Sequence, residues 1–151
     1  MDRASATTAQ LDEIAEALPQ RAATLSRLFL KRSSIQISRV EALVLNALAQ
    51  QPRRITELAA REAVSQPGIT LLVDRLQERG WVARGPDPSD RRAVLVSLTP
   101  AGEEVLERLR AEYRALLHEE MATLPDRDVR TLAAAIEILD GLIERLAEQE
   151  R

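Results

Sequence analysis

The sequence predicts a mainly α-helical fold with one small β-hairpin, and two observations lead to this fold class. Apolar residues recur at spacings of three and four along most of the 151-residue chain, as they do on one face of an α-helix. The exception lies between Gly80 and Gly102, where two β-type runs, residues 81–84 and 93–98, flank a polar turn over residues 86–92. Glycine and proline bound these runs, which is typical of a hairpin.

Two helices are predicted in the first third of the chain. Apolar spacing indicates an amphipathic helix over residues 9–32, in which Pro19 either kinks the helix or starts its main segment. The pair Ser33-Ser34 breaks it. Ser38 and Glu41 then have capping-box spacing and open a second helix, which stops at Gln51-Pro52.

A short helix and a capped helix follow before the hairpin. Residues 55–63 form the short helix, with Arg54 at the position where a capping side chain is expected, although arginine is an unusual cap. Ser65 caps the next helix, which carries Pro67 in its first turn and ends at Gly80. The two helices over residues 55–80 predict a helix-turn-helix.

Two long helices are predicted after the hairpin. The first starts at Thr99 or Pro100 and runs to about Leu124, where Pro125 follows. The last helix carries a heptad-like apolar seam at Val129, Leu132, Ile136, Leu139, Ile143 and Leu146. That seam either joins two copies of the chain or packs within one. The order of elements predicts a winged helix-turn-helix core over residues 36–100, flanked by long helices over residues 9–32 and 100–150.

The second helix of the helix-turn-helix is the candidate DNA reader. Ile69, Leu72, Val73 and Leu76 form its inward stripe, so the opposite face is available for contact. On that face, Gln66 and Thr70 suit hydrogen bonds to bases, and Pro67 and Leu71 suit thymine methyl groups. Arg75 fits either a phosphate contact or a partner on its own helix, Asp74 or Glu78.

The hairpin tip presents a second candidate contact, the run Asp90-Arg91-Arg92. One arginine inserts toward a minor groove in this interpretation, and Asp87 or Asp90 braces the other. The alternative is a solvated turn with a weak local ion pair. The predicted DNA-contacting set is Arg54, Ser65, Gln66, Pro67, Gly68, Thr70, Leu71, Arg75, Asp90, Arg91 and Arg92.

Charge is distributed unevenly along the chain. The formal net charge is −3, yet residues 21–52 carry +4 and residues 53–100 carry +2, whereas residues 101–151 carry −6. A basic middle suits a polyanionic partner, with an ordinary mixed surface as the alternative.

Composition excludes several classes of function. The chain has no cysteine and one histidine, which excludes disulfides, thiolate metal sites and multi-histidine metal sites. It has no nucleophile–base set and no phosphate-binding glycine loop, so we expect no enzyme, no cofactor and no metal. No apolar run approaches the ~20 residues of a membrane span, and the N-terminus has no apolar signal core. A cytoplasmic protein is the expectation.

The stretch ITELAAREAVSQPGITLLVDRLQERGWVARGPDPSDRRAVLVSLTPAGEE resembles the winged-helix core of MarR-type transcriptional regulators. The most specific parts are the wing sequence DPSDRR, the following LTPAG and the helix QPGITLLVDRLQERG. Three positions depart from the usual pattern. Leu71 stands where many members have a polar or basic residue, Arg54 stands where serine or threonine is usual, and Trp81 stands near the wing entrance where leucine is ordinary.

The resemblance implies a single-domain bacterial protein that acts as a homodimeric DNA-binding regulator, usually a repressor that a small phenolic or anionic ligand releases from a pseudo-palindromic site. It implies a dimer interface in the first and last helices, for which we name Leu11, Ile14, Leu18, Val129, Leu132, Ile136, Leu139 and Ile143. Candidate ligand-binding residues are Arg27, Lys31, Arg39 and Trp81. The alternatives are a regulator that responds to no ligand and a winged-helix module that binds proteins instead of DNA.

Overall fold

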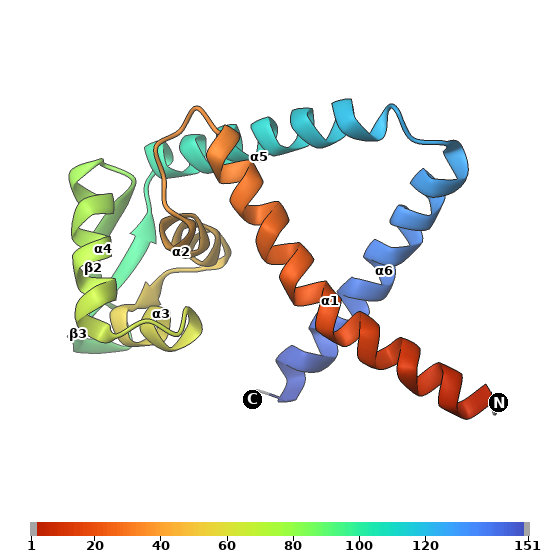
Figure 1. Cartoon of the computed structure of the whole chain (residues 1–151). Coiled ribbons are helices and arrows are strands. Elements are labelled where there is room, and N and C mark those ends of the chain that lie inside the picture. The colour runs from red at the N-terminus through yellow and green to blue at the C-terminus, as the bar shows by residue number, and fades with distance from the viewer. Residues whose placement is uncertain (1–2, 150–151) are drawn as a thin grey trace. The chain divides into compact units, whose positions relative to one another are not determined.

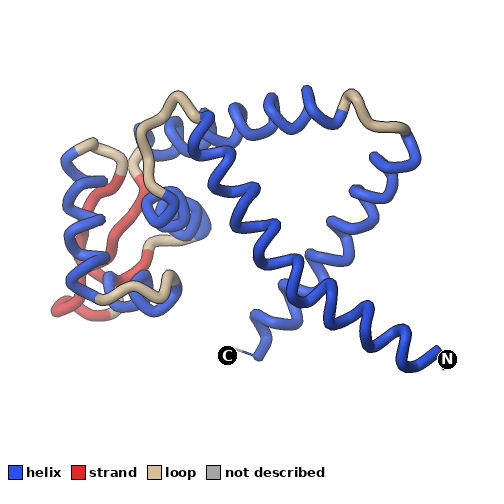
Figure 2. The backbone as a smooth tube through the Cα atoms, in the orientation of Figure 1, coloured by secondary structure: helices blue, strands red, loops and turns tan. Residues whose placement is uncertain are grey.

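The computed structural model describes residues 3–149, with side chains over residues 7–90 and 92–149. It confirms the predicted fold class, a mainly α-helical chain with a small sheet (Figure 2). In chain order the elements are α1 (Arg3–Arg32), α2 (Arg39–Gln50), β1 (Arg53–Arg54), α3 (Ile55–Arg61), α4 (Gln66–Glu78), β2 (Val82–Asp87), β3 (Asp90–Leu98), α5 (Pro100–Met121) and α6 (Asp126–Gln149).

The chain divides into two compact units, Met1–Glu112 and Tyr113–Arg151. The first unit contains α1 to α4, the sheet and the first half of α5. Helices α2, α3 and α4 gather around the sheet in Figure 1. The second unit contains the end of α5 and α6, and no described residue of α6 is buried.

The hydrophobic core lies in the first unit. Its fully buried side chains come from α2, α3, α4, the two long strands and the start of α5, and they are Val44, Leu45, Leu58, Ile69, Val73, Leu76, Val82, Val96, Leu106 and Leu109. Burying a side chain of this size contributes about 1.5–3 kcal/mol relative to leaving it in water. These residues therefore pack α4 and the hairpin against the same hydrophobic core.

The sheet has three strands in the order β1-β3-β2, one more than the sequence analysis predicts. The missed strand is the pair Arg53-Arg54, which aligns with Val96 and Leu95 of β3. Two residues are too few to display a period of two, so only pairing with β3 identifies them as a strand.

The hairpin is longer than predicted, and its turn is shorter. Strand β2 continues through Pro86 to Asp87, and β3 begins at Asp90, so the expected turn over residues 86–92 is wrong. A register shift between Pro86 and Asp87 accommodates the change. Pro86 is tolerated there because β2 is an edge strand.

Helix boundaries follow the predicted signals with small shifts. Ser38 and Glu41 form the capping box of α2, and Ser65 accepts a hydrogen bond from the backbone N–H of Gly68 at the start of α4. Gly80, with a φ of 73°, follows the end of α4.

Other boundaries required correction. Helix α1 begins at Arg3 and passes through Pro19, so proline does not start its main segment. Helix α3 ends at Arg61, before Ala63 turns to a φ of 51°, and α5 ends at Met121.

The apolar residues proposed for a dimer interface are largely uncovered in the single chain. On α1, Leu11, Ile14 and Leu18 are exposed. On α6, Val129, Leu132, Ile136 and Ile143 are exposed and Leu139 is half-buried. None of the described helices combines the length and the apolar character that a membrane crossing requires.

Candidate nucleic-acid interface

Burial fixes the rotation of α4 about its axis. Ile69, Leu72, Val73 and Leu76 all lie in the core, as the sequence predicts for the inward stripe. In a helix with 3.6 residues per turn, this leaves Gln66, Pro67, Thr70 and Leu71 at the opposite side of the N-terminal half. We call these four residues the reading face.

The reading face combines two polar residues, Gln66 and Thr70, with two apolar ones, Pro67 and Leu71. Gln66 and Pro67 are exposed, Thr70 is half-buried, and Leu71 is 62% exposed. The Thr70 hydroxyl donates to the carbonyl of Gln66 at 2.9 Å, so it is left with lone pairs that can accept a hydrogen bond. The face therefore offers an amide, an acceptor and an apolar surface to a partner.

Ser65 and Gly68 make local contacts at the start of α4, where the sequence predicts a Ser65 cap. The Ser65 hydroxyl caps α4, accepting from the Gly68 N–H at 3.3 Å. A Cβ at Gly68 would lie 3.0 Å from a methyl of Val64 and 3.1 Å from the Ser65 hydroxyl. The absence of a side chain at Gly68 therefore leaves room for the Ser65 cap.

Two ion pairs join α4 to its neighbours. Arg75 Nε lies 3.7 Å from Oε1 of the buried Glu41 on α2. The expected partner on its own helix is therefore wrong, because the α2 carboxylate lies within reach. Asp74 instead accepts from Arg84 of β2 at 2.7 Å, and Arg84 also donates to Gln77 at 2.6 Å.

The wing turn is organised by Asp87, whose side chain is buried. Its Oδ1 accepts from the N–H and the hydroxyl of Ser89, at 2.8 and 2.7 Å. Its Oδ2 accepts from Arg54 Nε and Nη2, at 2.8 and 2.6 Å. Hydrogen bonds from Ser89 and Arg54 lower the pKa of Asp87 to about 2. The described side chain that pairs with Asp87 is thus Arg54 of β1, whereas the expected brace of Arg91 by Asp87 or Asp90 lies outside the described residues.

Asp90 and Arg92 lie at the start of β3. Asp90 accepts from the backbone N–H of Arg92 at 3.0 Å, so it orders the backbone and does not hold the guanidinium. The Arg92 side chain is exposed and makes no ion pair within the part of the chain that the structure describes. The side chain of Arg91 lies outside the described residues.

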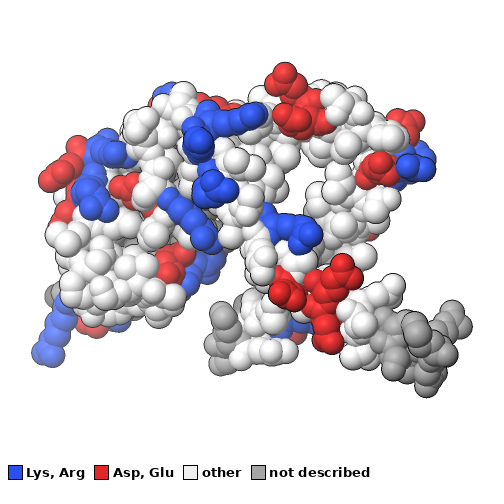
Figure 3. Space-filling view, viewed as in Figure 1, with Lys and Arg blue, Asp and Glu red and all other residues white. Residues whose placement is uncertain are grey.

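Basic side chains gather around these elements. On the face shown in Figure 3, Lys and Arg are most numerous over the helices of the winged helix-turn-helix core and over the C-terminal half of α1. This agrees with the positive net charge of residues 21–100. Such a surface attracts a polyanion even though the whole chain is acidic.

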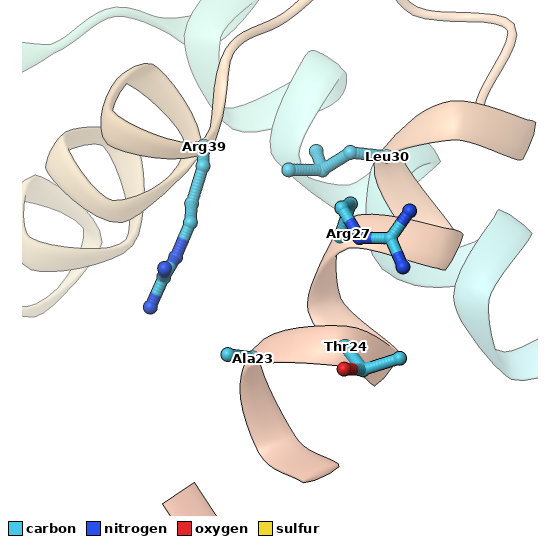
Figure 4. A pocket seen from close by; sticks show the side chains of 5 residues that line it. All are labelled: Ala23, Thr24, Arg27, Leu30 and Arg39. Atoms are coloured by element: carbon cyan, nitrogen blue, oxygen red, sulfur yellow. The ribbon is translucent and has the colours of Figure 1, made fainter. Parts of the chain in front are cut away.

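Two of the four candidate ligand-binding residues line one hollow. Arg27 of α1 and Arg39 at the start of α2 border a cavity of about 320 Å³ together with Ala23, Thr24 and Leu30 (Figure 4). Lys31 and Trp81 do not line it, and Arg79 lies over the Trp81 ring at 4.7 Å instead. Spacing along the chain could not single out Arg27 and Arg39 as a pair, because the two residues lie on different helices, α1 and α2.

The link between α1 and α2 is fixed to α5. Ser33 Oγ donates to Glu112 Oε2 at 2.6 Å, and both Ser34 N–H and its hydroxyl donate to the same carboxylate. These hydrogen bonds lower the pKa of Glu112. No group of three or more His, Asp or Glu side chains among the described residues is placed to hold a metal ion.

Sequence reasoning missed the functional geometry of Arg54, Asp87 and Arg84. One signal was present: Asp87 precedes Ser89 by two residues, the spacing of a turn in which a carboxylate accepts from the backbone. No comparable signal links Arg54 to Asp87, because 33 residues separate them.

The charge of Asp87 should contribute to stability in a defined pH window. Its pKa falls from 3.8 to about 2 on folding, so its contribution is complete above pH 3.8 and is lost as the pH falls through about 2. Asp87→Asn should therefore lower the free energy of unfolding at pH 7, and the difference from the parent chain should shrink between pH 4 and pH 2. Urea unfolding at a series of pH values measures it.

The control for removing one negative charge is Asp140→Asn, because Asp140 is an exposed carboxylate of α6. A difference for Asp87→Asn that stays constant from pH 7 down to pH 2 would contradict the assignment.

Comparison with known proteins identifies the family. The sequence model of the MarR family matches residues 35–93. An uncharacterized HTH-type transcriptional regulator of Bacillus subtilis, YpoP, is 31% identical over 106 residues, which cover 70% of this chain and 75% of the relative. The multiple antibiotic resistance protein MarR of Escherichia coli is 38% identical over 77 residues, which cover 50% and 54%.

A solved structure agrees in both fold and sequence. The structure named Multiple Antibiotic Resistance Repressor, MarR, superposes with a TM-score of 0.70 at 27% identity, over 85% of this chain and 94% of that one. These proteins are transcriptional regulators and not enzymes. The chain with the reading face on α4 and the wing between β2 and β3 belongs to the MarR family of winged helix-turn-helix transcriptional regulators.

Proposed function

We propose that this protein is a homodimeric regulator that reads a pseudo-palindromic DNA site and acts as a repressor. The observation that carries the proposal is the reading face of α4, which the core turns outward, together with the exposed Arg92 of the wing. The solved relative named as a repressor supports the direction of regulation.

Each element would contact a different part of the duplex. The N-terminal half of α4 would enter a major groove, where Gln66 suits an adenine or another base edge and Leu71 suits a thymine methyl group. The N-terminus of α4 favours a phosphate. Arg92, and Arg91 beside it, would reach the minor groove or its phosphates.

Selection from a randomised duplex pool tests this function directly. We expect the intact chain to enrich a pseudo-palindrome with half-sites about 10 base pairs apart, because two recognition helices of a dimer lie about one helical turn apart. Arg92→Ala should weaken binding about tenfold and reduce the dependence of log K on log salt by about 1. Leu71→Ala should change the selected bases.

Arg127→Ala is the matched control, since Arg127 is an exposed arginine of α6, a helix that carries none of the proposed DNA contacts. No enrichment by the intact chain, or equal losses for Arg92→Ala and Arg127→Ala, would contradict DNA reading by this surface.

The apolar stripes of α1 and α6 support self-association. Ile136 and Ile143 are 58% and 62% exposed in the single chain, and the seam continues along the helix. A large exposed apolar stripe is a common mark of an interface. A second copy offers the same stripe, as a twofold interface requires.

Ile136→Asp with Ile143→Asp should convert the dimer to a monomer. Two carboxylates buried in an apolar seam would raise the dimer dissociation constant by at least about a hundredfold. Sedimentation equilibrium measures the constant. Ile138→Asp, on the same helix and 64% exposed but outside the seam, is the control. A dimer that survives the double substitution would rule out this seam.

We also propose that a small organic anion binds between Arg27 and Arg39 and releases the DNA. Neither guanidinium has an ion pair among the described residues, and Leu30 and Ala23 supply apolar walls. Arg39 begins α2, and two residues later Glu41 faces Arg75 on the recognition helix. A shift of α2 on ligand binding would therefore reach α4 through a short chain of contacts.

Benzoate serves as the probe for this pocket. We expect millimolar benzoate to weaken binding of the selected duplex and to raise the melting temperature of the free protein. Arg39→Ala should increase the benzoate concentration required by about tenfold, since a charge-assisted hydrogen bond is lost. Lys31→Ala, outside the hollow, should leave it unchanged. Equal responses of the two variants would exclude the pocket.

A second candidate function is a protein-binding module, and the exposure of Leu71 favours it. A leucine that is 62% exposed on the outer face of α4 suits an apolar partner as well as a thymine methyl group. The same selection experiment separates the two functions. DNA binding falls steeply with salt because counterions are released, whereas apolar association with a protein does not.

A further inference from the structure

Arg54 occupies a place where a capping serine or threonine would satisfy the backbone of α3, yet its side chain has no acceptor atom. The structure shows the other use of this position. The carboxylate of Glu57 accepts from the Arg54 N–H at 2.9 Å and completes the cap from inside the helix. The side chain of Arg54 makes no cap hydrogen bond and extends to the wing instead.

The contact between Arg54 and the wing is close and charged. Nε and Nη2 donate to the same oxygen of Asp87, at 2.8 and 2.6 Å, while Nη1 lies 3.9 Å from Asp90. The Asp87 side chain is only 7% exposed, and its other oxygen already accepts two hydrogen bonds from Ser89. Charge-assisted hydrogen bonds of this kind are short and directional.

Both ends of the contact are fixed to the backbone. Arg54 pairs with Leu95 in the sheet and begins α3, so its Cα cannot drift from the body of the domain. Asp87 ends β2 beside a register shift and pairs with Asp90 at the hairpin tip, two residues beyond Gly85, the last β2 residue in the three-stranded part of the sheet. A clamp at that point ties the otherwise two-stranded tip to β1.

The clamp extends to the exposed wing arginine through Asp90. One oxygen of Asp90 lies near Arg54 Nη1, and the other accepts from the backbone N–H of Arg92 at 3.0 Å. We propose that Arg54 is a positioning residue, which sets the place of Arg92 through Asp87 and Asp90 and does not itself contact the DNA. This inference rests on the proposed DNA-binding function, and it replaces the expectation that Arg54 is a direct contact.

Energy considerations favour a positioning role over a stabilising one. The Arg54 side chain is 36% exposed, and partly solvated ion pairs contribute little to folding. Two of its five N–H groups donate to Asp87 and Nη1 lies 3.9 Å from Asp90, so the guanidinium is oriented toward the wing turn.

Cleavage by trypsin tests the clamp in the absence of DNA. We expect Arg54→Ala to raise the rate of cleavage after Arg91 and Arg92 by at least about fivefold, because a released tip opens locally. Cleavage after Arg61 in the same molecules reports global opening and should not change. Arg53→Ala is the matched control, because Arg53 is the neighbour in β1 and its guanidinium contacts Ala47 and Gln50 of α2.

A double-mutant cycle on the selected duplex tests the consequence for DNA. If Arg54 acts through Arg92, then Arg92→Ala should weaken binding about tenfold in the parent chain but less than about twofold in the Arg54→Ala background. The salt dependence should fall by about 1 in each single variant and in the double variant. If Arg54 contacts phosphate directly, the losses multiply and the double variant falls by about 2.

The variant Asp87→Asn separates the effect of the clamp on the position of Arg92 from the effect of the Asp87 charge on DNA binding. Removal of a negative charge near DNA would strengthen binding by electrostatics alone, whereas loss of the clamp should weaken it, as in Arg54→Ala. Unchanged wing cleavage in Arg54→Ala, multiplying losses in the cycle, or tighter binding by Asp87→Asn would overturn the inference. If the parent chain and Arg53→Ala both fail to bind DNA, the proposed function fails, and the inference fails with it even if the cleavage result holds.

Discussion

Burial of one stripe of α4 determines how the rest of the winged helix-turn-helix core is arranged. Leu72 and Val73 are adjacent in sequence and both buried, so the helix has one rotation that keeps its apolar side out of water. That rotation turns Leu71 outward, although it differs little from its neighbour in hydrophobicity. The reading face is therefore a consequence of the core.

Charged contacts then set the elements around α4 at defined positions. Arg75 reaches Glu41 of α2, Arg84 of β2 reaches Asp74, and Arg54 of β1 reaches Asp87 at the other end of β2. In each pair the arginine side chain is partly exposed, and ion pairs that solvent screens in this way contribute about 0–1 kcal/mol to stability. Their geometry matters more than their energy, because they connect the recognition helix and the wing to the elements that pack the core.

Two of the departures from the usual family pattern, Leu71 and Arg54, have different structural meanings. Leu71 lies on the surface with no packing reason for a large apolar side chain, which makes it a candidate for partner specificity. Arg54 gives up a side-chain cap and gains a contact across the sheet, while Glu57 supplies the cap hydrogen bond. One position is open to a partner, and the other acts within the chain.

The sequence by itself determined the helices, the caps at Ser38 and Ser65, the inward stripe of α4 and the family, because these depend on periodicity and on residues a few positions apart. Tertiary structure decided the two-residue strand β1, the length of the hairpin and the partners of Arg54 and Arg75. It also decided that Arg27 and Arg39 line a hollow that Lys31 and Trp81 do not. The physical reason is that ion pairs and pockets join segments by distance in space, and a local pattern of residues carries no record of that distance.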